Sequence, residues 1–268
     1  MANTVIHVLY EYLFALALSA ARLYPCLILV PVFSFNILKG IVRSGVVLAL
    51  AIVPTLGLQA QLALQMPGWP QLIALILKEG VIGILLGLVI SMPFWLFQSV
   101  GALFDNQRGA LIGGQLNPAL GSDVTPLGLL LQQTLILFLI LTTGLSGVTQ
   151  IIWDSYSVWP VMQWLPFPNH NGFEQYLALL TDTFSHIIIY AGPLVALLLM
   201  MDFSIAILSL YSPQLQAFVL SVPAKCLLGL LFFVLYIPTL STLGEERLYL
   251  LRDLSKLIKG LLGGQWHV

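Results

Sequence analysis

A short polar island interrupts a chain that is otherwise almost entirely apolar. Residues 101–110 read Gly-Ala-Leu-Phe-Asp-Asn-Gln-Arg-Gly-Ala, and the preceding run from 80 to 104 carries no charge. Charged and hydrogen-bonding groups among such segments must be sheltered by protein or face an aqueous path, because lipid offers them no partners. We therefore expect function to be concentrated in this island.

The composition indicates an integral membrane protein. Of 268 residues, 59% are hydrophobic and 8% are charged, whereas a soluble domain carries about 25% charged residues. The mean hydropathy is +0.98, and several uncharged runs reach the roughly 20 residues that cross a bilayer. A net charge of −1 gives no polybasic surface for nucleic acid. Cys26 and Cys226 lie in apolar segments, so we expect no disulfide framework, no metal and no cofactor.

The hydropathy pattern predicts an all-α membrane protein with kinked or re-entrant helices. We expect one multi-helix domain over residues 1–244 and an amphipathic tail over 245–268. Pro93 predicts a kink or break within the third apolar segment. The six apolar segments cover about 8–33, 44–64, 71–95, 127–153, 176–201 and 215–240.

A simple count of membrane spans does not give a consistent topology. Lys39 and Arg43 place the first loop in the cytoplasm by the positive-inside rule. Six full spans would then put the basic tail outside, where its charges are not expected. We therefore expect at least one segment to be broken or re-entrant, with the Pro93 and Pro213 regions as the best candidates.

Within the island, Asp105 and Arg108 are three residues apart and can form a local ion pair on one helical face. Asn106 and Gln107 add further donors and acceptors. A structural ion pair in a loop and a functional site both fit this pattern. The glycine-rich stretch 113–121 fits either a surface loop or a segment that folds inward and obstructs a pore.

Other charges lie inside or beside apolar segments and should be paired. Asp202 and Lys225 flank the turn at Pro213-Gln214 and can pair across a helical hairpin. Contacts from Asp202 to Lys78 and Glu79 are the competing arrangement.

The first, third and fifth apolar segments carry further residues whose spacing or chemistry suggests a structural role. Glu11 and Arg22 are three helical turns apart and so lie near one face. Gly83 and Gly87 have the spacing that lets two helices approach closely. His186 has no second ligand nearby in the sequence, so we interpret it as a packing or hydrogen-bonding histidine.

The motif content argues against an enzyme. The sequence has no HExxH, no GxSxG and no P-loop. A secondary transporter of a small solute would show an internal repeat with broken helices, and no clear repeat is visible in the hydropathy. A purely structural scaffold stays open as a third reading.

The island also resembles a family signature. Pro93-Phe94-Trp95, then Gly101, then residues 105–110, is similar to the signature of the SctT/SpaR/YscT family of type III secretion export-apparatus proteins, which are related to flagellar FliR. Weaker matches follow in the family's order: Arg43-Ser44-Gly45, Lys78-Glu79 with Gly83, Asn117-Pro118, Thr125-Pro126-Leu127-Gly128, residues 212–218 and Pro223-x-Lys225. Asp202 stands where the family usually has Glu, and Gln216 stands where it has Asn.

The resemblance implies a non-enzymatic subunit of an export gate in the bacterial inner membrane, within the needle-complex base. Its implied partners are SctR-like (FliP-like), SctS-like (FliQ-like) and SctU-like (FlhB-like) subunits, together with unfolded secretion substrates and membrane lipids. Such a subunit looks like a fusion of the SctR and SctS types, each built from helical hairpins. Apolar segments would then bury against partners and need not all cross lipid.

The resemblance also implies roles for individual residues. We expect a plug loop after residue 108 that helps to close the channel at rest. Its base would be Asp105, Asn106, Gln107 and Arg108, and the loop itself would include Gly109, Gly113, Gly114, Gln115, Asn117, Pro118 and Gly121. Polar contacts between helices are expected at Lys78, Glu79, Asp202, Pro213, Gln214 and Lys225.

Overall fold

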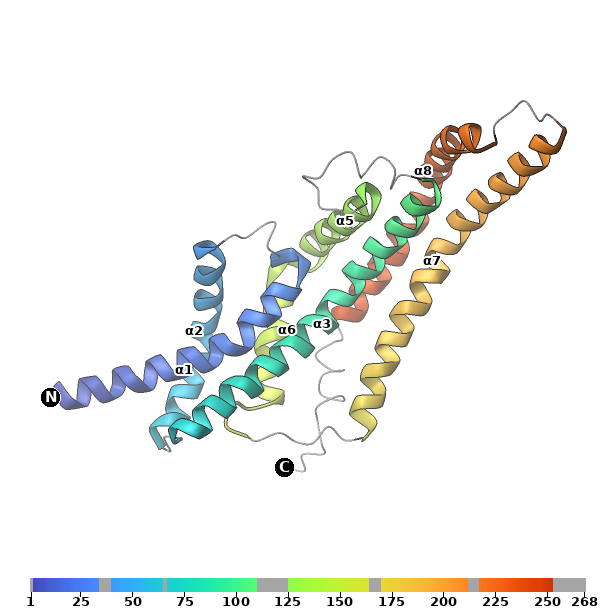
Figure 1. The fold of residues 1–268 in the computed structure, drawn as a ribbon. Helices are drawn as coiled ribbons and strands as arrows, with labels where there is room; N and C mark the ends of the chain where they lie inside the picture. Colours follow the sequence, from blue (N-terminus) through green and yellow to red (C-terminus); the bar gives the residue numbers. More distant parts are fainter. Residues whose placement is uncertain are drawn as a thin grey trace. The chain divides into compact units, whose positions relative to one another are not determined.

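The computed structural model describes residues 2–33, 40–64, 67–109, 125–163, 170–211 and 217–252. Across these ranges the chain is helical, with no strand, which confirms the all-α fold class (Figure 1). The elements are α1 (Ala2–Leu29), a 3-10 turn η1 (Pro31–Phe33), α2 (Ile41–Leu64), α3 (Trp69–Gln107), α5 (Pro126–Thr142), α6 (Gly144–Val158), α7 (His170–Tyr211) and α8 (Ala217–Arg252).

The helices are those of a multi-pass membrane protein. Five are long and apolar enough to cross a bilayer, and α5 with α6 makes a sixth when that bent pair is counted as one span. Two of them are far longer than a single crossing requires. At 1.5 Å per residue, the 39 residues of α3 and the 42 of α7 span about 58 and 63 Å, against a hydrocarbon core of about 30 Å. Part of each must therefore lie outside the hydrocarbon.

The broken segment lies elsewhere than the sequence suggests. The expected single helix over 127–153 is wrong: α5 ends at Thr142, α6 begins at Gly144, and the pair is bent by 87°. Gly144 has φ +71°, a left-handed conformation that glycine adopts without a steric penalty.

The predicted break at Pro93 is also wrong, because α3 continues through it. A proline removes one backbone donor, and the flanking Met92 and Phe94 are buried, so packing holds the helix together. Pro213 lies outside the described residues.

Helices α3 and α8 contain the island and the start of the expected tail. The island is the last part of helix α3 up to Gln107. Helix α8 runs without interruption from Ala217 to Arg252, and the division expected at residue 245 stays a prediction. The rest of the expected amphipathic tail lies outside the described residues.

A first unit combines α1, α2, α6 and the part of α3 up to Met92. Helices α1 and α2, the blue pair in Figure 1, cross and pack against each other, with a core that includes Leu18, Leu58 and Leu62. Helices α1 and α3 run parallel and touch through the paired glycines. A Cβ at Gly83 would collide with the backbone oxygen of Arg22, and one at Gly87 would lie 3.0 Å from Cys26 Cα. The predicted close approach is confirmed.

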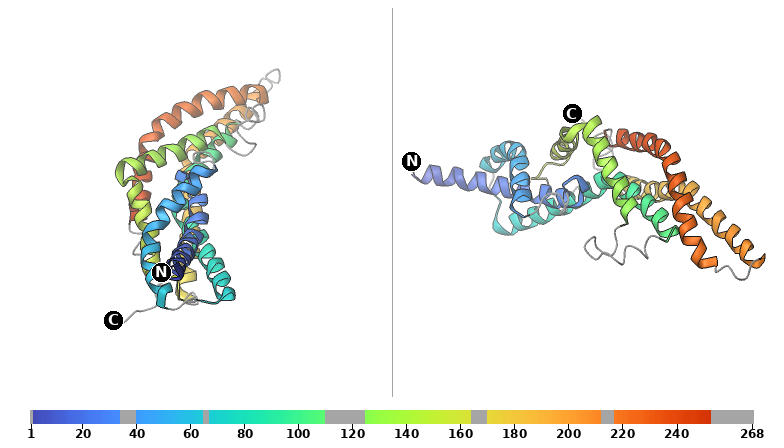
Figure 2. Two further views of the ribbon diagram at one scale, coloured as in Figure 1. Left: turned by 90° about the vertical axis from the view of Figure 1, so that its left-hand side faces the viewer. Right: turned by 90° about the horizontal axis from the view of Figure 1, so that it is seen from above.

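A second unit combines the end of α3 from Pro93, α5, most of α7 and most of α8. Helices α7 and α8, gold and orange-red in Figures 1 and 2, form an antiparallel hairpin. The rings of Phe104 in α3 and Phe233 in α8 stack with their centroids 5.4 Å apart. The hairpin exposes large apolar side chains, such as Met200 at 72% and Leu227 at 75%. An apolar surface of this kind requires lipid or protein against it.

Candidate functional site

Asp105 joins the end of α3 to the beginning of α5. Its side chain is fully buried, and its Oδ2 accepts a hydrogen bond of 2.8 Å from the backbone N–H of Leu127. That N–H has no partner within its own helix, and Pro126 before it has no N–H to offer. A carboxylate at a helix N-terminus is also favoured by the helix dipole. Asp105 is therefore a cap for α5 supplied by another helix.

Arg108 completes the pairing of Asp105. Its Nε and Nη2 lie 2.8 and 2.6 Å from Asp105 Oδ1, so each carboxylate oxygen has its own partner. The guanidinium also lies over the Phe104 ring, 5.7 Å from the ring centroid. The ion pair expected from the spacing of three is present, with Asp105 in the last turn of a helix and Arg108 just after its end.

Gly109 ends this helical segment. It has φ +85°, and its N–H donates to the carbonyl of Asn106 at 3.1 Å. Glycine is the usual residue at this position because a side chain would be strained there. Asn106 is exposed and Gln107 is half-buried. The other residues expected in the plug, Gly113, Gly114, Gln115, Asn117, Pro118 and Gly121, lie outside the described residues.

The backbones of α3 and α5 meet at a pair of glycines. A Cβ on Gly101 would lie 2.6 Å from Gly128 Cα, and a Cβ on Gly128 would lie 2.8 Å from the Gln98 carbonyl oxygen. One turn further along, Gln132 Nε2 donates to Gln98 Oε1 at 2.9 Å. We call Gly101, Asp105, Arg108, Gly109 and Leu127 the loop frame, because they hold the two ends of the segment 110–124.

Lys225 of α8 links the α7/α8 hairpin to the loop frame. Its Nζ lies 2.9 Å from Asp202 Oδ1 and donates to the Gln107 carbonyl at 3.1 Å. A lysine at a helix C-terminus satisfies a carbonyl that has no partner within the helix and complements the dipole. Of the two arrangements considered for Asp202, the pair with Lys225 is therefore the one present. Pro213 and Gln214 lie outside the described residues.

Lys78 and Glu79 belong to a separate, buried ion cluster in the first unit. Glu79 Oε2 lies 2.5 Å from Arg22 Nε, and Glu79 Oε1 lies 2.9 Å from Lys78 Nζ. The side chains of Arg22 and Glu79 are fully buried, and that of Lys78 is 3% exposed. Arg22, Lys78 and Glu79 make up the buried ion cluster, to which α1 contributes one residue and α3 two.

The two cations of this cluster also hold the chain that leaves α6. Arg22 Nη2 donates to the Trp159 carbonyl at 2.9 Å, and Lys78 Nζ donates to the carbonyls of Val161 and Gln163 at 2.6 and 2.9 Å. Two cations face one carboxylate, so these carbonyls and the C-terminal end of α6 compensate the surplus positive charge. The cluster therefore fixes α6 against α1 and α3.

The partner of Arg22 is the residue that sequence reasoning missed. Glu11 was the neighbour expected on its face, whereas the actual partner, Glu79, is 57 positions away. No local spacing reports such a pair. One feature of the sequence does point to it: Arg22, Lys78 and Glu79 are all charged residues inside apolar segments, and buried charges require partners of opposite sign.

A second unexpected ion pair joins the other end of the α7/α8 hairpin. Arg247 Nη1 lies 2.6 Å from Asp182 Oδ2, and Arg247 Nε donates to the Tyr190 hydroxyl at 3.1 Å. His186 Nδ1 lies 2.7 Å from the Asp182 carbonyl oxygen, which confirms its interpretation as a hydrogen-bonding histidine. Within the described ranges, no three potential ligands converge on a metal position.

Comparison with known proteins extends over nearly the whole chain. The family described as bacterial export proteins, family 1, matches residues 13–250. The Yop proteins translocation protein T of Yersinia pestis is 32% identical over 237 residues, covering 87% of this chain and 89% of that protein. The surface presentation of antigens protein SpaR of Salmonella typhimurium is 26% identical, covering 82% and 81%. The flagellar biosynthetic protein FliR of Bacillus subtilis is 25% identical, covering 82% and 85%.

Proposed function

Because the chain belongs to family 1 of the bacterial export proteins, we propose that it is a non-enzymatic subunit of a type III secretion export gate. The proposed gate lies in the bacterial inner membrane and conducts unfolded proteins. SctR-like and SctS-like subunits complete the channel, and an SctU-like subunit is a further partner. The family match carries this proposal.

The loop frame supports a plug role for the segment after residue 108. The Asp105 carboxylate accepts a hydrogen bond from the Leu127 N–H and pairs with Arg108. The residues on both sides of the segment 110–124 are therefore held by one buried carboxylate. Gly109 at φ +85° allows the chain to turn out of α3 at this point. We propose that the segment closes the channel at rest and that the frame stays fixed while the segment moves.

Deletion of residues 112–120 tests the plug. We expect ion leakage across the inner membrane to rise, while assembly of the gate is retained because the loop frame is intact. Leakage is measured with a membrane-potential dye, and secretion by the amount of substrate in the medium. A glycine-serine replacement of equal length serves as the control for loop length. The plug role fails if leakage and secretion are both unchanged by the deletion.

The exposed apolar faces of α7 and α8 provide surface for partner subunits as well as for lipid. Their side chains include Ile188 at 70% and Phe203 at 69% exposed. Purification from the native operon should yield two small hydrophobic partners in a fixed, unequal stoichiometry. Purification of the chain alone would instead favour a solute transporter, which is then tested by uptake into liposomes.

Crosslinking to a secretion substrate tests whether this protein lines the export path or is a purely structural scaffold. A photoreactive amino acid at Gln115 or Asn117 should crosslink to a stalled secretion substrate if the segment lines the path. The same probe at Glu174, an exposed residue of α7 in the first unit, is the control position. A gate that secretes normally and yields no crosslink at either plug position would indicate a scaffold.

A further inference from the structure

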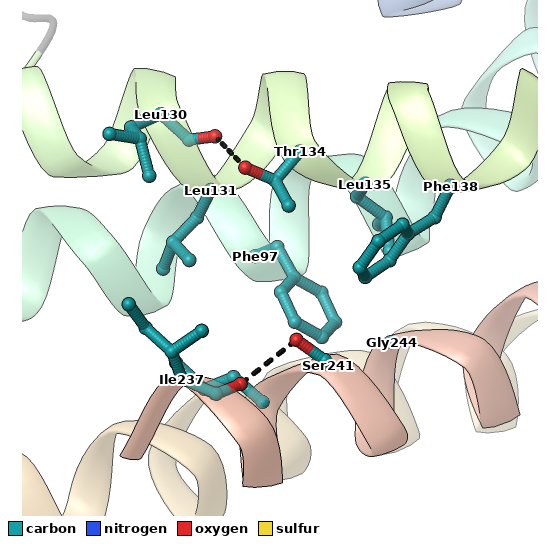
Figure 3. Close-up of a pocket in the computed structure, with 10 residues that line it drawn as sticks. Phe97, Leu130, Leu131, Thr134, Leu135, Phe138, Ile237, Ser241 and Gly244 are labelled. Carbon is teal, nitrogen blue, oxygen red and sulfur yellow. Dashed lines mark hydrogen bonds between the residues drawn. The ribbon is translucent and has the colours of Figure 1, made fainter. Parts of the chain in front are cut away.

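A small apolar pocket lies in the second unit between α3, α5 and α8 (Figure 3). Its volume is about 100 Å³. Phe97 forms one wall, and the remaining wall residues come from successive turns of α5 and α8. They are Leu130, Leu131, Thr134, Leu135 and Phe138 of α5, and Ile237, Leu240, Ser241 and Gly244 of α8.

The two polar residues of the lining have no free donor for a polar ligand. Thr134 Oγ1 donates to the Leu130 carbonyl at 2.8 Å, and Ser241 Oγ donates to the Ile237 carbonyl at 2.9 Å (Figure 3). Both hydroxyl donors are therefore used within their own helices. A buried water needs two to four polar partners, so this pocket favours an apolar occupant.

The surface next to the pocket is apolar as well. Leu130 and Ile237, which line it, are 47% and 40% exposed, and Leu137 and Val234 beside them are 53% and 62% exposed. Ile237 and Val234 lie on α8, which has the length and hydropathy of a membrane span, and Leu130 and Leu137 lie on α5, which makes a span only when it is counted together with α6. The pocket therefore opens onto a surface that suits hydrocarbon rather than a charged or soluble ligand.

We propose that this pocket binds a segment of a lipid acyl chain. An apolar cavity of about 150 Å³ lined by similar residues accepts a molecule of the size of benzene, so this one suits a few methylene groups. An occupant restores the dispersion contacts that the lining residues lose around a void. A peptide entering the pocket would bring backbone C=O groups for which the lining has no free donor, whereas an acyl chain brings no polar group.

Photolabelling of the assembled gate in vesicles tests this proposal. The probe is a phosphatidylcholine with a diazirine on the distal half of one acyl chain, mixed into phosphatidylethanolamine vesicles. Lipid at the outer surface labels exposed residues such as Leu137. A chain inside the pocket also labels Leu131, Leu135 and Leu240, which are at most 6% exposed. Peptide mass spectrometry after illumination distinguishes the two patterns.

Ser241→Leu fills the pocket and should lower the labelling of Leu131 and Leu135 several-fold, with labelling of Leu137 unchanged. Thr134→Ile fills it from the opposite wall and serves if Ser241→Leu does not fold. The matched control is Ser204→Leu on α7, where an exposed serine also donates to its own helix, to the Met200 carbonyl at 2.8 Å. This control should leave all labels unchanged.

Two outcomes would overturn the proposal. One is labelling confined to exposed side chains in the unaltered protein. The other is a crosslink from the pocket residues to a partner subunit, which would make the pocket a protein interface. The labelling pattern does not depend on secretion, so it can fail or succeed independently of the proposed export role.

Discussion

The two polar sites of this molecule differ in how their charges are surrounded. In the first unit, Arg22, Lys78 and Glu79 are essentially inaccessible and are held by α1, α3 and the chain that leaves α6. In the second unit, Asp105 is equally buried, but its partner Arg108 and both members of the Asp202–Lys225 pair are partly accessible. Arg108 and Lys225 are 12% exposed and Asp202 is 35% exposed. Fully enclosed charges depend on one another for compensation, whereas a partly accessible charge can exchange a lost partner for water.

This difference has an energetic consequence. Removing one partner of a buried ion pair leaves an uncompensated charge in a poorly polarisable interior, which costs several kcal/mol. Removing one partner of an accessible pair lets water take its place, and the cost is commonly below 1 kcal/mol. Substitutions in the buried ion cluster should therefore cost the most stability and those in the Asp202–Lys225 pair the least, with the buried Asp105 and its partly exposed partner Arg108 between them.

Glu79→Gln should have the largest effect. Two buried cations would lose the carboxylate that pairs with both of them, so we expect a loss of about 3–5 kcal/mol in unfolding free energy. Thermal unfolding of the purified protein and its yield in membranes measure this loss. Glu174→Gln, at an exposed position of α7, is the control. A triple variant, Arg22→Met, Lys78→Met and Glu79→Leu, should recover much of the stability, because no charge then remains in the cluster.

If Glu79→Gln left the unfolding free energy unchanged, the buried ion cluster would contribute no more to stability than a surface ion pair. That result would contradict the contrast between the two polar sites.

Gly83→Ala should have the second-largest effect on stability, because Gly83 lies where α3 packs against Arg22 of α1. The added Cβ would collide with the Arg22 backbone oxygen and the Pro25 ring, and overpacking of this kind costs about 1–3 kcal/mol. Gly80→Ala on the same helix has open space at its Cβ and should be neutral or slightly stabilising. Equal unfolding temperatures for the two variants would contradict the close contact between α1 and α3.

Asp105→Ala should have a smaller effect on stability and a clear effect on closure. It removes the cap on Leu127 and the partner of Arg108, and loss of a helix cap costs about 1–2 kcal/mol. We expect increased ion leakage in assembled gates, measured with a membrane-potential dye. Asp105→Asn retains an acceptor oxygen and should leak less than Asp105→Ala. If leakage were unchanged in both variants, the contacts of Asp105 in the loop frame would not contribute to channel closure.

Asp202→Asn with Lys225→Met should give the smallest effect. Both side chains are partly exposed, so we expect a coupling free energy of about 0.2–1 kcal/mol in a double-mutant cycle of unfolding measurements. A coupling of several kcal/mol would show that this pair is as enclosed as the buried ion cluster, and it would erase the contrast between the two units.

Local patterns in the sequence were enough for several features. The hydropathy predicts an all-α membrane protein, since only helices or closed barrels satisfy their backbone groups in lipid. The spacing of three between Asp105 and Arg108 predicts their ion pair, and the spacing of four between Gly83 and Gly87 predicts a close helix contact. The Asp105–Ala110 string predicts the family, which the match over residues 13–250 confirms.

Other features were decided only when the helices packed. The pairing of Arg22 with Glu79 joins residues 57 positions apart, and the bonds from Lys78 to Val161 and Gln163 span still longer separations. Neither has a local signal, because any buried charge needs a partner and the sequence does not say which one it reaches. The bend at Gly144 likewise depends on a left-handed φ, a conformation that glycine permits but does not require.

The sequence by itself determined the class, the family and the contacts within one or two helical turns. The tertiary structure decided which distant charges meet and where the chain turns, because those outcomes depend on the packing of several helices at once.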